Sequence, residues 1–263
     1  MDDNYQIYLN RVAKMMLPET YQNQVQHLQE SQKFQLSPGG VRQAVSFPGY
    51  TLITPPAQED TDNEKFYQKI QSYQQTLIEL PFNNNLIAPL PPSSFHLTVA
   101  DLIWDRAYSD ACQDNPQFET DLRSCIAEIF QQYQNQSNSQ NNTIRWQMLG
   151  LMIMPRAIGI CLVPQNEEFY EAIMKLRRAI FQNPKLIALG IEQNYHFIAH
   201  ITLGYFGKVP PNLERNKLAQ ALSHLNQEWL SNSPEFLVKN VQLRKFDDMT
   251  RYYRESDWAS LDL

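Results

Sequence analysis

The sequence lacks any run of about 18 apolar residues, which is the length that a membrane-spanning helix needs. Its first ten residues, MDDNYQIYLN, are acidic and polar, whereas a secretory signal begins with basic residues and continues with apolar ones. We therefore expect neither membrane insertion nor export, and we expect a cytoplasmic protein. The 263 residues are 43% hydrophobic, which suffices for one globular unit with its own core.

Cysteine is scarce, with only Cys112, Cys125 and Cys161. An odd number at wide spacings has neither the CxxC pairs of a metal site nor the density of a disulfide scaffold, and indicates buried thiols in a reducing compartment. An excess of basic charge is also lacking. The formal net charge of -6 argues against broad binding to duplex DNA, which needs a basic face. A small anionic ligand, or a nucleic-acid end in a local basic pocket, is compatible with this charge.

Several signature motifs are absent. Without GxxxxGK[ST] or GxGxxG, a P-loop or Rossmann nucleotide site has no support, and without GxSxG a serine hydrolase is disfavoured. No HExxH glutamate accompanies His196 and His200, and in a strand their rings would lie about 13 Å apart, too far to share one metal. His196 either lines the outer part of a cleft or, as we expect, has a structural role. The sequence predicts no metal and no cofactor.

Hydrophobic periodicity predicts an order of roughly β-α-β-α-ββ-α-β-α-β, preceded by one or two surface helices within residues 1–35. Residues 1–32 are predicted to form a helical extension on a main body of 33–263, and the polar tract 134–142 is predicted to be a flexible loop. A helix capped by Asn166 is expected at 167–181. The predicted strands are 50–54, 95–104, 143–155, 157–164, 197–206 and 235–246, and the other predicted helices are 63–80, 118–134 and 213–230.

Two of the predicted strands carry a histidine in the same aliphatic frame. The frames are His96-Leu97-Thr98-Val99 and His200-Ile201-Thr202-Leu203. Because side chains in a strand alternate between faces, each imidazole should lie on the same face as a threonine hydroxyl, roughly 7 Å away. Two such strands facing each other would bring two imidazoles and two hydroxyls together.

This pairing suits phosphodiester hydrolysis. An imidazole titrates near neutrality, so one ring can accept a proton from water while the other donates one to the leaving oxygen. The hydroxyls of Thr98 and Thr202 would then donate hydrogen bonds to the phosphoryl oxygens. The competing interpretation of either motif alone is a histidine on a half-exposed strand face with its hydrogen bonds satisfied. The matching frames favour a shared site.

These residues resemble the 2H phosphoesterase superfamily, whose members carry two histidines in HxTx or HxSx motifs, one in each lobe of a pseudo-twofold fold. Both tetrads match at every defining position. The segment KFQLSPGGVRQAVSFPGYTLI, at Lys33–Ile53, is similar to the opening segment of a largely uncharacterised branch. The resemblance runs from about Lys33 to the C-terminus. It implies a bilobal α+β fold with antiparallel sheets, outer helices and an active-site cleft between the lobes.

The resemblance also implies metal-independent hydrolysis of a cyclic or 2′-5′ phosphodiester in a nucleotide or RNA end, with His96, Thr98, His200 and Thr202 as the catalytic set. RNA-processing members often have an arginine five residues after the second histidine, where this chain has Tyr205, an aromatic that would stack on a base. The alternative is a nucleotide-binding module that does not cleave its ligand.

The segment Val241–Ser256 concentrates arginines and tyrosines. From it Arg251 and Tyr253 are predicted to bind substrate, although a solvated charged edge explains the same composition. Arg156, in the predicted hairpin turn, allows the same two interpretations. The oligomeric state and the natural substrate do not follow from the sequence.

Overall fold

The structure is a computed structural model that describes residues 3–37, 40, 42–81, 86–136, 143–193, 195–230 and 234–263. Most of the polar tract predicted as a loop, at 137–142, lies outside the described residues, as do three positions of the segment Lys33–Ile53. Within the described residues, no helix has the length and apolar character that crossing a membrane requires.

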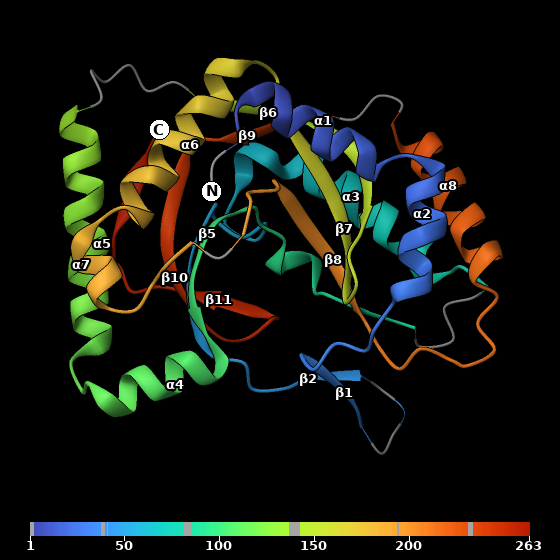
Figure 1. The fold of residues 1–263 in the computed structure, drawn as a ribbon, viewed down its shortest axis with the longest axis horizontal. Coiled ribbons are helices and arrows are strands. Elements are labelled where there is room, and N and C mark those ends of the chain that lie inside the picture. The colour runs from blue at the N-terminus through green and yellow to red at the C-terminus, as the bar shows by residue number, and fades with distance from the viewer. Residues whose placement is uncertain are drawn as a thin grey trace.

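Two antiparallel sheets form the centre of the molecule, one in each lobe (Figure 1). The first has the order β11-β10-β3-β5, with β12 also paired to β10, and the second has the order β4-β8-β7-β6-β9. A small β1-β2 hairpin lies apart from both. The strands are β1 Phe34–Leu36, β2 Arg42–Ala44, β3 Gly49–Ile53, β4 Ile87–Pro89, β5 Thr98–Trp104, β6 Ile144–Ile153, β7 Ala157–Pro164, β8 His200–Phe206, β9 Phe236–Val238, β10 Asn240–Asp248, β11 Arg251–Tyr253 and β12 Ser260–Asp262.

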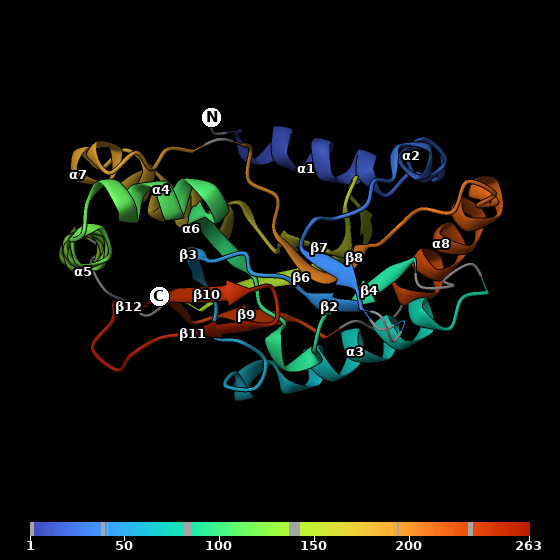
Figure 2. The ribbon, with the colours of Figure 1, turned by 90° about the horizontal axis from the view of Figure 1, so that it is seen from below.

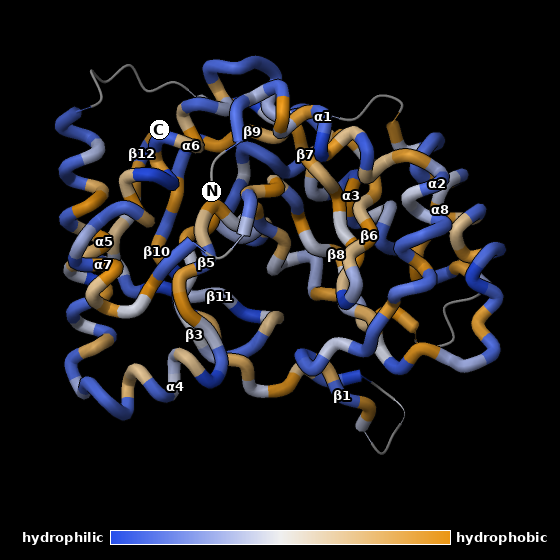
Figure 3. The backbone as a smooth tube through the Cα atoms, viewed as in Figure 1, coloured by the Kyte–Doolittle hydropathy of each residue, from blue (hydrophilic) through white to orange (hydrophobic). Residues whose placement is uncertain are grey.

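The α-helices lie outside the sheets, as the view from below shows (Figure 2). Much of their surface is hydrophilic, whereas a long hydrophobic stretch follows β7 (Figure 3). This distribution buries the apolar face of each element against its neighbours. The helices are α1 Tyr5–Met15, α2 Pro18–Gln24, α3 Glu64–Ile78, α4 Asp105–Asp114, α5 Phe118–Gln136, α6 Glu167–Phe181, α7 Pro184–Ala188 and α8 Arg215–Trp229.

The N-terminal helices are anchored on the second sheet by buried hydroxyls. Tyr8 donates to the Leu162 carbonyl at 2.9 Å, and Tyr21 donates to the Leu151 carbonyl at 2.5 Å. The chain then runs beside β8, where the backbone N–H of Ser31 donates to the carbonyl of Phe206 at 2.7 Å. This segment therefore packs on the main body, and its last residues reach the space between the lobes.

The α+β bilobal fold is confirmed, with antiparallel sheets and outer helices. The predicted β6-β7 hairpin is present, and Asn166 caps α6 by accepting a hydrogen bond from the Phe169 N–H at 2.9 Å. The single predicted strand 235–246 is wrong: it divides into β9, which pairs with β6, and β10, which pairs with β3. The chain passes from one sheet to the other at Lys239 between them.

Irregular pairing shapes the two histidine strands. In β5 the register with β3 skips Val99 and Leu102, so each of these is an extra residue. In β8 the register with β7 skips Leu203. A bulge of this kind moves the following side chains to the other face of the sheet. Val99 and Leu203 each lie three residues after a histidine, so the two lobes share the irregularity.

Candidate active site

A cavity of about 400 Å³ lies between the two sheets and brings the paired motifs together. It includes all four residues of the predicted catalytic set, His96, Thr98, His200 and Thr202. The other described lining residues are Ser31, Gln32, Lys33, Phe47, Thr51, Leu90, Ser94, Asp101, Trp104, Met154, Arg156, Ala157, Tyr195, Tyr205, Phe246, Met249 and Tyr252.

The two imidazoles are held in the same way. Nδ1 of His96 hydrogen-bonds the Ser94 carbonyl at 2.7 Å, and Nδ1 of His200 hydrogen-bonds the Ile198 carbonyl at 2.8 Å. A carbonyl oxygen only accepts, so each Nδ1 must carry a proton. In the neutral ring Nε2 is then unprotonated and able to accept a proton. Each ring therefore keeps one nitrogen for chemistry within the cavity.

The flanking aliphatic side chains hold these strands in place. Leu97, Val99 and Ile201 are 0% exposed and Leu203 is 1% exposed. The histidines and threonines between them are half-buried and line the cavity. Gly159 lies opposite Thr202 in β7, where a Cβ atom would approach the Ile201 carbonyl oxygen to 2.5 Å. A glycine is thus required beside this bulge.

Burial lowers the pKa of both imidazoles, because a low-dielectric surrounding disfavours the charged ring. For His96 burial lowers the pKa to about 4, against opposing effects from the Ser94 carbonyl and from Asp101. For His200 burial again lowers the pKa, with Lys33 acting in the same direction and Asp101 against it. Burial therefore favours the neutral form of both rings when no anion is bound.

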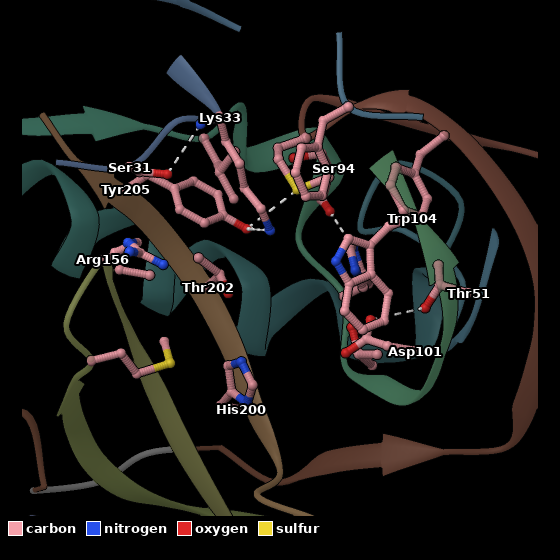
Figure 4. A pocket seen from close by; sticks show the side chains of 18 of the residues that line it. Ser31, Lys33, Thr51, Ser94, Asp101, Trp104, Arg156, His200, Thr202 and Tyr205 are labelled. Atoms are coloured by element: carbon pink, nitrogen blue, oxygen red, sulfur yellow. Dashed lines mark hydrogen bonds between the residues drawn. The ribbon is translucent and has the colours of Figure 1, made fainter. Parts of the chain in front are cut away.

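Two cations lie on one side of the cavity. Lys33 Nζ is 3.4 Å from the Tyr205 hydroxyl and 4.7 Å from the centre of the Phe47 ring. Arg156 is exposed in the β6-β7 turn and also lines the cavity. Figure 4 shows both near Thr202 and Tyr205. This side of the cavity offers positive charge and hydroxyl donors to an anion.

Asp101 faces the same cavity from the other sheet (Figure 4). The Tyr195 hydroxyl donates to Asp101 Oδ2, and the Thr51 hydroxyl lies 3.5 Å from Oδ1. If side chains alternated strictly along the strand from Thr98, Ala100 and not Asp101 would face the cavity. The extra residue Val99 instead turns Asp101 to the cavity, which is why sequence periodicity missed it.

Tyr205 lines the cavity, whereas Arg251 and Tyr253 do not. Residues alternate along β11, so the residue between these two, Tyr252, faces inward, with its ring centre 4.3 Å from that of His96. Arg251 lies over the Tyr253 ring at 5.2 Å and borders a smaller, adjoining cavity that also includes Ser94 and Tyr252.

Two other basic residues of Val241–Ser256, Arg244 and Lys245, are held in ion pairs. Arg244 is 2% exposed and pairs with Glu59 at 2.6 Å, and Lys245 pairs with Glu119 at 2.6 Å. These pairs hold β10 to neighbouring segments, so the arginine and lysine at these positions are structural.

His196 is exposed and lies 3.3 Å from Asp3 of the N-terminal segment, not among the lining residues of the cavity. Cys125 and Cys161 are buried free thiols and Cys112 is half-buried. Among the described residues there is no group of three or more His, Cys, Asp or Glu placed to hold a metal ion.

Comparison with known families gives a match over part of the chain. Residues 33–146 match the 2H-phosphodiesterase family described as "Domain of unknown function (DUF1868)". The match begins at Lys33, includes the first histidine motif and ends before the second. Over these residues it confirms the resemblance to the 2H phosphoesterase superfamily that the sequence predicts. A comparison with curated proteins gives no significant match.

Similar solved structures were also found, and the first of them shares the fold. The conserved protein of unknown function ATU0111 from Agrobacterium tumefaciens str. C58 is 15% identical with a TM-score of 0.59, over 88% of this chain and 91% of that one. LigT from E. coli, complexed with 3′-AMP, is 13% identical with a TM-score of 0.43, over 83% of this chain and 99% of that one. TT0787 of Thermus thermophilus is 16% identical with a TM-score of 0.43, over 74% of this chain and 86% of that one.

Proposed function

We propose that this protein hydrolyses a cyclic or 2′-5′ phosphodiester in a nucleotide or RNA end, with His96 and His200 as general acid and base. The family match supports phosphoesterase chemistry in general. One observation carries the finer proposal: each imidazole donates Nδ1–H to a carbonyl two residues earlier, which leaves Nε2 of both rings for one cavity.

The reaction assigns a separate task to each ring. One neutral imidazole takes a proton from water as the water oxygen attacks phosphorus. The other, protonated, gives its proton to the departing ribose oxygen as the P–O bond breaks. The negative diester counteracts the burial that lowers the pKa of the rings, so binding of substrate helps one ring to hold its proton. No metal ion enters this scheme.

Thr98 and Thr202 are proposed to donate hydrogen bonds to the phosphoryl oxygens, where negative charge develops. Lys33 and Arg156 supply charge on the same side as Thr202 (Figure 4). Tyr205, Tyr252 and Trp104 provide aromatic surface for a base. Arg251 and Tyr253 are assigned at most to a part of the substrate that extends beyond the main cavity.

The test is hydrolysis of 2′,3′-cyclic nucleotides, 3′,5′-cyclic nucleotides and a 2′-5′ linked dinucleotide in the presence of EDTA. At least one should be turned over, and His96→Ala and His200→Ala should each reduce the rate by about 10²-fold or more. His224→Ala, on the exposed face of α8, is the matched control. Turnover that requires a metal, or that survives both substitutions, would refute the mechanism.

A binding module that does not cleave its ligand is the second candidate. It is favoured by the lowered pKa of both imidazoles, because burial disfavours the protonated ring that the acid step requires. Tight binding of a nucleotide without turnover of any of these diesters would select this candidate.

A further inference from the structure

The charged groups of the cavity form an asymmetric set. Among the described lining residues, Lys33 and Arg156 are the only permanent cations and Asp101 is the only carboxylate. With both imidazoles neutral, these three groups give the cavity a net charge of +1. Arg244 is not among the lining residues and is paired with Glu59 at 2.6 Å. While both rings are neutral, the cavity therefore matches one negative charge, and a second negative charge on the ligand has no cation to balance it.

Two neighbouring hydroxyl groups fix the position of the Asp101 side chain. Its Oδ2 accepts from Tyr195, in the segment before β8, and the Thr51 hydroxyl of β3 lies 3.5 Å from Oδ1. Tyr195 thus links the second lobe to the strand that carries Asp101 in the first. A carboxylate only accepts hydrogen bonds, so it offers no hydrogen bond to a phosphate oxygen and repels its charge.

We propose that Asp101 makes the cavity selective for the charge of its ligand, accepting a phosphodiester with one negative charge and expelling a phosphomonoester with two. This inference rests on the proposed function for the identity of the ligand. In hydrolysis, water adds to phosphorus, the P–O bond to ribose breaks and the ribose oxygen gains a proton. The product then carries a P–OH group whose ionisation above pH ~6 gives the dianion. Once the ring that took the proton from water has lost it again, Asp101 thereby favours release of product over its retention.

Coulomb energy is proportional to the charge of the ligand. Removing the charge of Asp101 should therefore change the binding free energy of a dianion about twice as much as that of a monoanion. If Asp101→Asn tightens binding of a diester by a factor f, it should tighten binding of the matching monoester by about f squared. Asparagine retains an oxygen that accepts from Tyr195, so the side-chain position is kept.

The test measures binding of two probes that differ by one charge, a 2′-O-methyl nucleoside 3′-monophosphate and its methyl ester. The 2′-O-methyl group blocks attack by that oxygen. Calorimetry at pH 8, where the monoester is the dianion, compares the wild type with Asp101→Asn. Asp110→Asn, on the exposed face of α4, is the matched control and should leave both affinities unchanged.

The proposal predicts that Asp101→Asn strengthens monoester binding at least tenfold and diester binding by about the square root of that factor. Equal factors for the two probes, or no change in either, would overturn it while leaving the proposed function intact. If neither probe bound to the wild type or to the variant, both the proposed function and this proposal would be contradicted. The proposal would also be contradicted if the wild type bound the monoester more tightly than the diester and Asp101→Asn did not increase that preference.

Discussion

Asp101 and Tyr205 occupy equivalent positions in the two lobes, each five residues after a histidine and each turned into the cavity by an extra residue in its strand. The extra residues, Val99 and Leu203, are themselves equivalent. The pseudo-twofold relation thus includes the backbone irregularity as well as the histidine motif. What differs is the chemistry: one lobe contributes a carboxylate and the other a phenol beside Lys33.

Removing a threonine hydroxyl should slow the chemical step. Thr98→Val and Thr202→Val keep the shape of the side chain but remove a donor to the phosphoryl oxygens, and loss of one such donor lowers kcat about 10²–10³-fold. Steady-state kinetics on the best diester would show this with little change in KM. Thr120→Val, exposed on α5, serves as control. A change in KM alone would assign these hydroxyls to ground-state binding.

The pH dependence of kcat/KM should reflect the burial of both rings. Activity falls on the alkaline side when the acid loses its proton, and burial lowers the pKa of both His96 and His200 from the usual 6.5. The alkaline fall in kcat/KM should therefore begin below pH 6.5. The alkaline fall in kcat should begin at a higher pH, because a bound anion raises the pKa of each ring.

The same profile for Asp101→Asn should shift further toward acid, because the charge of Asp101 raises the pKa of both rings in the wild type. A kcat/KM profile that stays flat to pH 8 in the wild type would contradict a buried imidazole as the acid.

Lys33 and Arg156 should act mainly on substrate binding. Lys33→Met keeps the aliphatic stem beside Phe47 and Tyr205 but removes the charge. A hydrogen bond to a charged group contributes about 1.5–3 kcal/mol, so KM should rise roughly tenfold or more, with Arg156→Met giving a similar change. Lys65→Met, exposed on α3, is the control. Unchanged KM in both variants would place the phosphate elsewhere in the cavity.

The N-terminal helices should contribute to folding stability. Tyr8→Phe removes a donor to the Leu162 carbonyl and an acceptor for the buried Ala199 N–H, which should lower the free energy of unfolding by about 1–3 kcal/mol. Tyr5→Phe is the matched comparison, because its hydroxyl is only partly buried and lies 3.4 Å from the Pro164 carbonyl. In urea denaturation, Tyr8→Phe should have a lower free energy of unfolding than Tyr5→Phe. Equal stability of the two variants would show that the buried contact adds nothing.

The sequence predicts the fold and the two motifs that meet in the cavity because both depend on local patterns. Alternation within His96–Val99 and His200–Leu203 correctly predicts which side chains are buried. Lys33 is visible as the first residue of the resembling segment, but its place in the cavity depends on how that segment crosses β8.

Other residues of the site could not be predicted from local sequence patterns. A bulge depends on how one strand pairs with another, so the inward turn of Asp101 cannot be read from its own strand. The strand β11 is only three residues long, which is too short for its alternation to be recognised in the sequence. For that reason the sequence favours Arg251 and Tyr253 over Tyr252, the residue that lines the cavity.

The most direct test of the account is a double-mutant cycle on hydrolysis of the preferred diester in EDTA, with His96→Ala, His200→Ala and the double variant. Two rings that act on the same phosphorus depend on each other, so the double variant should be about as slow as the slower single variant. If the two losses multiplied instead, each ring would act independently and a shared acid-base site would be contradicted.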